Sequence, residues 1–185
     1  MKPGARAREF ELAMQWLLDC GLIHKVHRVS KPGVPLSAYA DLSAFKLYMV
    51  DVGLLSAKCG LDPRTLLEGS RVFEEFRGAL AEQHVLQQLV SNGAEQIAYW
   101  APDSGAAEVD FVIQSHGETY PIEVKATENL QAKSLKIYSE KYKPRVCIRT
   151  SLSDFRKETW LVNIPLYAIG VLDRMLIAED SAGER

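Results

Sequence analysis

The spacing of apolar residues changes several times along the chain. In residues 8–19 and 72–89 apolar side chains recur three and four positions apart, which predicts two amphipathic helices. Helical spacing returns in residues 131–142 and again near residues 166–177. Short alternating or continuous apolar runs predict strands at 22–29, 45–52, 96–101, 108–114, 119–126, 145–151 and 159–165. This order of helices and strands predicts an α/β fold built around a mixed sheet.

The N-terminal part of the pattern is typical of the end of a winged-helix unit. A helix over residues 8–19 is followed by two strands, and a turn rich in Pro and Gly separates those strands. The earlier helices of such a unit are not seen, so we expect further residues upstream. We therefore predict a partial winged-helix-like segment over residues 1–60 and a larger domain over residues 70–178.

Composition places the chain among ordinary globular proteins. Of its 185 residues 47% are hydrophobic and 25% are charged, and three cysteines lie far apart in the sequence. The N-terminus lacks the apolar core of a signal peptide, and no apolar run reaches the roughly 20 residues that span a bilayer. These features predict a cytoplasmic protein without a membrane segment.

The net charge of −2 argues against a protein that grips nucleic acid by charge alone. Any contact with nucleic acid must therefore be local. One local group of cations follows residue 130 and consists of Lys133, Lys136, Lys141, Lys143, Arg145 and Arg149. The alternative interpretation of this group is a solvated helix face.

The acidic stretch over residues 108–126 is the most informative part of the sequence. His116-Gly117 suits a two-residue hairpin turn, because Gly tolerates a positive φ angle. With that turn, Asp110 lies opposite Glu123 and Glu108 lies opposite Lys125. Alternation along the strands then predicts an apolar face formed by Val109, Phe111, Ile122 and Val124. Glu108, Asp110, Glu123 and Lys125 are expected on the other face.

Two carboxylates that face each other across a hairpin repel, unless a cation lies between them. Oxygen ligands of this kind suit Mg²⁺ or Mn²⁺, so we expect one of these ions near Asp110 and Glu123. The alternative is that this face is simply exposed to water. Glu82 favours the site, because it lies within the apolar stripe Ala79, Glu82, Val85, Leu86 and Leu89 of the helix over residues 72–89. A salt bridge from Glu82 to a buried Arg or Lys is the alternative there.

The set Glu82, Asp110, Glu123 and Lys125 resembles the core of the PD-(D/E)XK nucleases, although "EVD" stands where a Pro-Asp pair is usual. The flanking phrases "FRGALAEQHVLQQL", "YWAPDSGAAEVDFVI", "YPIEVKA" and "SLKIYSEKY" resemble the C-terminal domain of unknown function of a large prokaryotic AAA+ ATPase family. The phrases "WLLDCGLIHKVHRV" and "FKLYMVDVGLL" resemble the winged-helix linker of that family. The chain has no G-x-x-x-x-G-K-[ST] loop, so the resemblance implies no ATP site within it.

The resemblance implies a restriction-endonuclease-like mixed sheet flanked by helices, with Glu82, Asp110, Glu123 and Lys125 as catalytic residues. Glu82, Asp110 and Glu123 would be ligands of Mg²⁺ or Mn²⁺, and nucleic acid and an AAA+ ATPase module would be partners. The expected function is metal-dependent hydrolysis of phosphodiester bonds. One alternative is a catalytically inactive module of nuclease fold that binds nucleic acid or protein beside an ATPase. The other is a winged-helix DNA-binding regulator that uses residues 8–52.

Overall fold

A computed structural model describes residues 10–176, apart from 63, 65–72, 106 and 128–130. The helical elements are α1 (Glu11–Asp19), η2 (Leu36–Tyr39), α2 (Val52–Lys58), α4 (Phe73–Ser91), α5 (Lys133–Tyr142) and η3 (Leu166–Val171). The strands are β1 (Ile23–Val29), β2 (Ala40–Met49), β3 (Ile97–Trp100), β4 (Val109–Ser115), β5 (Glu118–Val124), β6 (Cys147–Ser151), β7 (Arg156–Lys157) and β8 (Leu161–Pro165).

The strands form one mixed sheet in the order β2-β1-β3-β4-β5-β6-β8-β7. Antiparallel ladders join β3, β4 and β5, whereas β5, β6 and β8 run parallel. The parallel pair β5–β6 requires a crossover connection, and α5 lies within that connection. The predicted α/β architecture with a mixed sheet is therefore confirmed.

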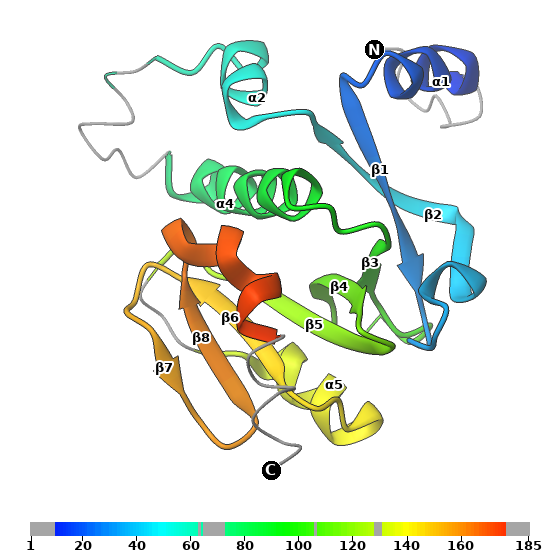
Figure 1. Cartoon of the computed structure of the whole chain (residues 1–185). Coiled ribbons are helices and arrows are strands. Elements are labelled where there is room, and N and C mark those ends of the chain that lie inside the picture. Colours follow the sequence, from blue (N-terminus) through cyan, green and yellow to red (C-terminus); the bar gives the residue numbers. More distant parts are fainter. Residues whose placement is uncertain (1–9, 63, 65–72, 106, 128–130, 177–185) are drawn as a thin grey trace.

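Helices cover both faces of the central strands. In Figure 1, α4 and η3 lie on one side of β5, β6 and β8, and α5 lies on the other side. On the α4 side, apolar residues of α4 and η3 pack against the sheet; from α4 these are Ala81, Val85, Leu86 and Leu89. On the α5 side, Leu135 and Tyr138 pack against Trp100, Val109 and Val112. Burial on both faces explains why these strands read as apolar runs.

The stripe predicted for α4 is partly wrong. Val85, Leu86 and Leu89 are buried, but Ala79 is exposed, and Ala81 takes its expected place in the core. The stripe also contains a polar member, since Gln83 is only 1% exposed. Its amide nitrogen donates to the backbone oxygen of Met49 at 2.6 Å, and its amide oxygen accepts from the Met49 backbone N–H at 2.8 Å. These two hydrogen bonds of Gln83 connect the end of β2 to α4.

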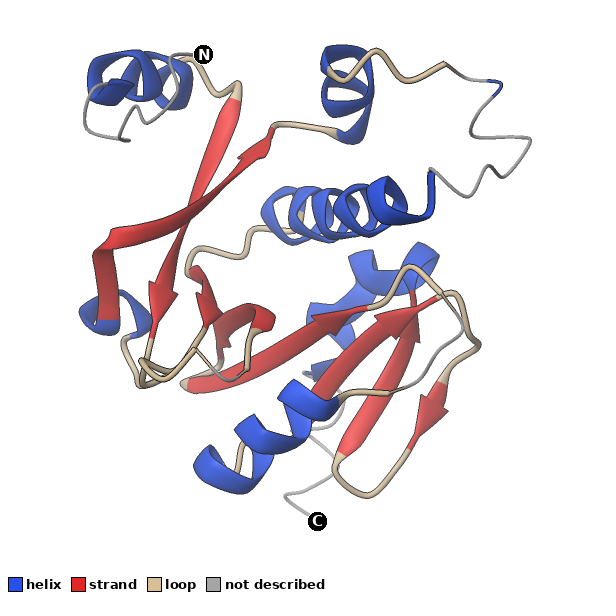
Figure 2. Cartoon of the chain, turned by 180° about the vertical axis from the view of Figure 1, so that it is seen from behind, coloured by secondary structure: helices blue, strands red, loops and turns tan. Residues whose placement is uncertain are grey.

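The N-terminal hairpin belongs to the same sheet as the rest of the chain. Strands β1 and β2 pair antiparallel, and β1 also pairs in parallel with β3, where His27 meets Ala98. Figures 1 and 2 show this hairpin extending from the central sheet toward α1 and α2. The winged-helix character of the segment and the division of the chain between residues 60 and 70 stay predictions.

Candidate functional site

The hairpin of β4 and β5 has the predicted turn and register. His116 and Gly117 both have positive φ angles, of 50° and 78°, as a two-residue turn of the favoured type requires. Strand pairs run from Ser115 with Glu118 to Phe111 with Ile122, which confirms the predicted register over this length. The next step of that register would set Asp110 beside Glu123.

A β-bulge lies at this point of β4, in its ladder with β3. Ala98 of β3 pairs with Val112, but Trp100 pairs with Val109, so Asp110 and Phe111 together face the single residue Tyr99. As a result Val109 packs in the cluster on the α5 side, whereas Phe111 packs on the α4 side. The prediction that Val109 shares a face with Phe111, Ile122 and Val124 is therefore wrong.

Asp110 lies at the bulge, among other carboxylates. Its Oδ2 accepts a hydrogen bond from the backbone N–H of Val124 at 2.7 Å. Burial, and after it the charges of Glu82 and Glu123, raise the pKa of Asp110 to about 7. The Val124 amide and the ammonium of Lys46 act in the opposite direction. Glu82, Asp110 and Glu123 are thus close enough to interact, as the sequence predicts.

Glu82 reaches this group from the third turn of α4. Its Oε2 accepts a hydrogen bond from the hydroxyl of Tyr48 at 3.0 Å and lies 3.9 Å from Nζ of Lys46. Burial and the charge of Glu82 raise the pKa of Tyr48 far above its ordinary value, so that its hydroxyl stays a donor. The salt bridge that we weighed as the alternative for Glu82 is therefore present, although neither side chain is fully buried.

Glu123 is the most deeply buried carboxylate of the set. Its side chain is 7% exposed, and its Oε1 accepts a hydrogen bond from Nζ of Lys125 at 2.6 Å. Its other oxygen, Oε2, is buried and has no hydrogen-bond partner among the described residues. A buried carboxylate oxygen without a donor is costly. The interpretation of this face as merely wet is therefore wrong for Glu123.

Two residues of the site were not predicted, and both come from β2. Lys46 forms a salt bridge to Glu108 as well as to Glu82, and Tyr48 packs its ring 5.6 Å from that of Phe111. Glu108 thus pairs with Lys46, while Lys125 pairs with Glu123. A signal was present in the sequence, because Lys46 and Tyr48 lie two positions apart and therefore point to the same face of a predicted strand.

Burial alone would disfavour the charged form of Lys46, but its partners reverse the effect. The hydrogen bond to Glu108 and the charges of Glu82, Glu108 and Asp110 together raise its pKa above the ordinary value. Lys46 is therefore a permanent cation of the site at neutral pH. The carboxylates of the cluster are compensated from two sides, by Lys46 from β2 and by Lys125, which directly follows β5.

The arrangement as it stands is not a ready metal centre. Within the described part of the chain, no group of three or more His, Cys, Asp or Glu side chains is placed to hold a metal ion. The donor chemistry nevertheless fits a hard divalent cation, since it consists of carboxylates that repel each other and includes the unpartnered Oε2 of Glu123.

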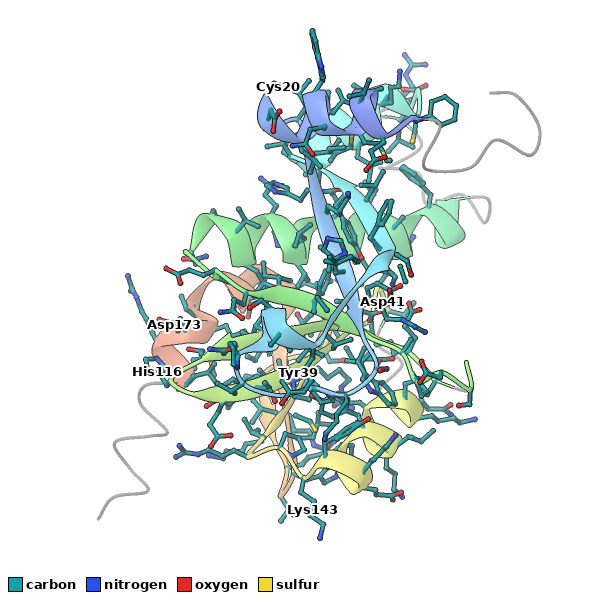
Figure 3. All side chains as sticks on the ribbon, turned by 90° about the vertical axis from the view of Figure 1, so that its right-hand side faces the viewer. Cys20, Tyr39, Asp41, His116, Lys143 and Asp173 are labelled. Carbon is teal, nitrogen blue, oxygen red and sulfur yellow. The ribbon has the colours of Figure 1, made fainter. Side chains whose placement is uncertain are left out.

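The predicted group of cations after residue 130 divides into two sets. Lys133, Lys136, Lys141, Lys143 and Arg145 are exposed on and after α5, as a solvated face requires. Arg149 is wrongly placed in that group, because it is only 2% exposed and its Nε donates to Oδ1 of Asn163 at 2.9 Å. Figure 3 shows Lys143 at the far end of α5.

The C-terminal part of the chain matches a known protein family. Residues 77–169 of the 185 match the model of a domain of unknown function, DUF4143. The chain belongs to this family. The match spans most of α4, the sheet from β3 to β8 and part of η3, and so includes Glu82, Asp110, Glu123 and Lys125. Residues 1–65, which contain Lys46 and Tyr48, are similar to a second domain of unknown function, DUF8612.

Neither the curated proteins nor the solved structures contain a match to this chain. Within the described residues, the helices lack the combination of length and apolar character that crossing a membrane demands. The cytoplasmic location stays a prediction.

Proposed function

We propose that this DUF4143 chain is a metal-dependent phosphodiesterase that acts on nucleic acid, with Glu82, Asp110, Glu123 and Lys125 as its site. The observation that supports this most strongly is the crowding of carboxylates around Asp110, whose pKa is raised to about 7 by burial, Glu82 and Glu123. Strongly shifted carboxylates gather at functional sites, because chemistry needs groups that titrate near neutral pH.

The roles follow from the contacts of each side chain. Asp110, Glu123 and Glu82 would hold Mg²⁺ or Mn²⁺, a cation that stabilises negative charge on a phosphoryl group and lowers the pKa of bound water. Lys125 holds Glu123 in place, because its Nζ donates a hydrogen bond to Oε1 of Glu123 at 2.6 Å. Lys125 would also stabilise negative charge on the phosphoryl group or activate water.

The restriction-endonuclease-like nature of the sheet is part of this proposal. A helix that carries Glu82, a bulged strand with Asp110 and a neighbouring strand with Glu123, directly followed by Lys125, stand in the order that this kind of nuclease core requires. The bulge supports the assignment, since bulges are common beside active sites, where they redirect a side chain.

The site residues Lys46 and Tyr48 lie in the segment similar to DUF8612, and the carboxylates lie in the segment of DUF4143. We therefore propose that both segments act together, beside an AAA+ ATPase module as partner. The chain itself has no phosphate-binding loop of the Walker type.

One observation favours the alternative of an inactive module of nuclease fold that binds nucleic acid or protein. Lys46 and Lys125 already form ion pairs with Glu82, Glu108 and Glu123, which offsets part of the repulsion among the carboxylates without a bound metal ion. The winged-helix regulator has less support, because one edge of its hairpin is taken up by the pairing of β1 with β3.

Calorimetric titration with Mn²⁺ separates these functions. The proposal expects binding by the wild type, loss of binding in Asp110→Ala, and unchanged binding in Asp154→Ala, which removes an exposed carboxylate of the same type. Hydrolysis of DNA and RNA with Mg²⁺ or Mn²⁺ should depend on Asp110 and Lys125. Mn²⁺ binding without hydrolysis of either polymer would favour the inactive module, and equal hydrolysis by Asp110→Ala and Lys125→Ala would exclude this site.

A further inference from the structure

Positive charge is concentrated on α5 and directly after it. The whole chain has a net charge of −2, yet residues 131–145 contain five lysine and arginine side chains and a single acid, Glu140. All six of these side chains are exposed. The five cations are Lys133, Lys136, Lys141, Lys143 and Arg145. Excess acid lies elsewhere in the chain, so α5 forms a local cationic surface on a protein that is acidic as a whole.

Three of these cations share one face of the helix. Leu135 and Tyr138 point into the core and are 0% exposed, so they mark the buried side of α5. With about 3.6 residues per turn, Lys133, Lys136 and Lys141 lie on the opposite side, toward solvent. These three side chains make up the cationic face of α5, which extends from the first turn of the helix to the last.

The charges of the cationic face are not used within the described part of the chain. None of its three ammonium groups forms an ion pair there, and this includes pairs with Glu140. Nζ of Lys141 lies 5.1 Å from the centre of the Tyr142 ring, but Lys141 is still exposed to solvent. Lys46 and Lys125 differ, because each is bound to a carboxylate of the site. The cationic face can therefore bind an anion without breaking an ion pair of its own.

The cationic face begins beside the carboxylate cluster. Lys133 lines a cavity of about 250 Å³ together with Glu123 and Lys125. From this point the ten residues of α5 extend over about 15 Å, at 1.5 Å per residue. Lys143 directly follows the helix at its other end, as Figure 3 shows. The cationic face thus leads from the proposed site along the surface of the molecule.

A nucleic acid suits a face of this length and charge. It carries a phosphate at every nucleotide, and a duplex has about one negative charge per 1.7 Å of its axis. Ile137 lies among the lysines and is 45% exposed, so it offers an apolar surface to a base beside the phosphates. A lipid bilayer fits less well, because the apolar side of α5 is packed in the core and cannot insert among acyl chains.

We propose that the cationic face of α5, formed by Lys133, Lys136 and Lys141, binds the phosphate backbone of a nucleic acid strand and leads that strand to the carboxylate cluster. The choice of a nucleic acid rests on the function proposed above. Binding to this face requires neither a metal ion nor hydrolysis, so it can be tested separately from that function.

Fluorescence anisotropy of a labelled oligothymidylate, titrated with the full chain without divalent ions, is the first test. The double variant Lys136→Ala/Lys141→Ala should bind about tenfold more weakly and reduce the slope of log K against log salt by about 1.4, since each phosphate contact of a single strand contributes about 0.7. Lys58→Ala/Arg174→Ala is the matched control, because it removes two exposed cations outside α5. Equal losses in both double variants, or no loss in either, would overturn the proposal.

Competition experiments test the class of partner. Polyglutamate with the same number of charges should displace the labelled oligothymidylate much less than unlabelled oligothymidylate does, because it has no base that could contact Ile137. Equal displacement by the two polymers would overturn the assignment to nucleic acid. The same conclusion would follow if phosphatidylserine vesicles bound the wild type more tightly than oligothymidylate does and lost this binding in Lys136→Ala/Lys141→Ala.

Hydrolysis assays with Mg²⁺ or Mn²⁺ separate a failure of this surface from a failure of the proposed function. Where both hold, Lys136→Ala/Lys141→Ala should raise KM about tenfold with little change in kcat, because the lost contacts are made equally with substrate and transition state. Binding at α5 without any hydrolysis would leave the surface standing and remove the phosphodiesterase. Hydrolysis by the double variant with an unchanged KM would remove the surface alone.

Discussion

The carboxylate of Asp110 accepts a hydrogen bond from the backbone N–H of Val124, with 2.7 Å between Oδ2 and the nitrogen. This contact joins β4 to β5 at the point where the bulge has moved Asp110 out of the regular ladder. Burial together with the charges of Glu82 and Glu123 nevertheless raises the pKa of Asp110 to about 7. The folded chain therefore holds a proton at Asp110 under conditions in which an ordinary aspartate is ionised.

The stability of the chain should depend on this proton. Between the ordinary pKa of 3.8 and about 7 the folded state binds the proton and the unfolded state does not, so this group's contribution to stability falls as pH rises through that range. Asp110→Asn keeps an acceptor for the Val124 N–H without a charge. We expect it to raise the free energy of unfolding at pH 8 by about 2 kcal/mol, with a much smaller effect near pH 4.

Urea denaturation at several pH values measures this difference. Asp154→Asn is the control, because it changes an exposed aspartate away from the cluster. A difference between Asp110→Asn and the wild type that is the same at every pH would contradict the assignment of a raised pKa to Asp110.

Lys46, on the hairpin of β1 and β2, should also influence the pKa of Asp110. The charge of Lys46 lowers the pKa of Asp110, so Lys46→Met should raise that pKa further. The Met side chain is similar in length to Lys but lacks the ammonium group, whose Nζ lies 5.1 Å from the centre of the Tyr99 ring. Titration of the Asp110 carboxyl carbon by NMR gives the value directly.

Lys136→Met is the matched control for Lys46→Met, since it removes an exposed ammonium from α5.

The substitution Lys46→Met should also affect metal binding. If Lys46 compensates Glu82 in place of a metal ion, Lys46→Met should bind Mn²⁺ about tenfold more tightly than the wild type. Unchanged values for both the pKa of Asp110 and the Mn²⁺ affinity would show that Lys46 has no influence on the site.

Gln83 should be important for the position of the N-terminal hairpin. Its buried amide bonds to both the N–H and the C=O of Met49, so Gln83→Leu leaves two backbone groups without their partner. We expect a loss of about 2–4 kcal/mol in the free energy of unfolding. Hydrogen exchange should become faster at the Met49 amide. Gln15→Leu, at an exposed position of α1, should have neither effect.

The regular parts of the fold and site could be predicted from the sequence because they follow local rules. The turn at His116-Gly117 depends on backbone angles that Gly tolerates, and the register from Phe111 to Ile122 follows from that turn. Glu82 is recognisable because a carboxylate within an apolar stripe needs a partner. Each of these inferences uses residues that are neighbours in sequence or across one hairpin.

The features that sequence reasoning missed depend on contacts between distant segments. The bulge at Asp110 and Phe111 arises where β4 pairs with β3, and the sequence of β4 alone does not predict it. Lys46 enters the site because β2 and β1 extend the sheet, which a separate winged-helix-like segment would not require. Arg149 was grouped with surface cations, although its place on β6 buries it against Asn163.

The hairpin turn offers a prediction that does not depend on the function of the site. His116 has a φ angle of 50° and precedes Gly117, and Asn is preferred to His at the first position of such a turn. We expect His116→Asn to raise the free energy of unfolding by about 0.5–1 kcal/mol. The substitution also removes the contact of His116 with Asp173, whose Nε2–Oδ1 distance is 3.7 Å. Figure 3 shows the two residues together at one edge of the molecule.

The contact with Asp173 should matter little, since both side chains are about half exposed and water screens such a pair. Measurement in about 0.5 M salt weakens it further, so that the turn effect can be observed alone. Gly117→Ala is the complementary variant: no atom lies within 4 Å of the added Cβ, and only the φ angle of 78° opposes it. Gly117→Ala should lower the free energy of unfolding by about 1 kcal/mol. A destabilised His116→Asn together with a neutral Gly117→Ala would show that the two positive φ angles do not govern this turn.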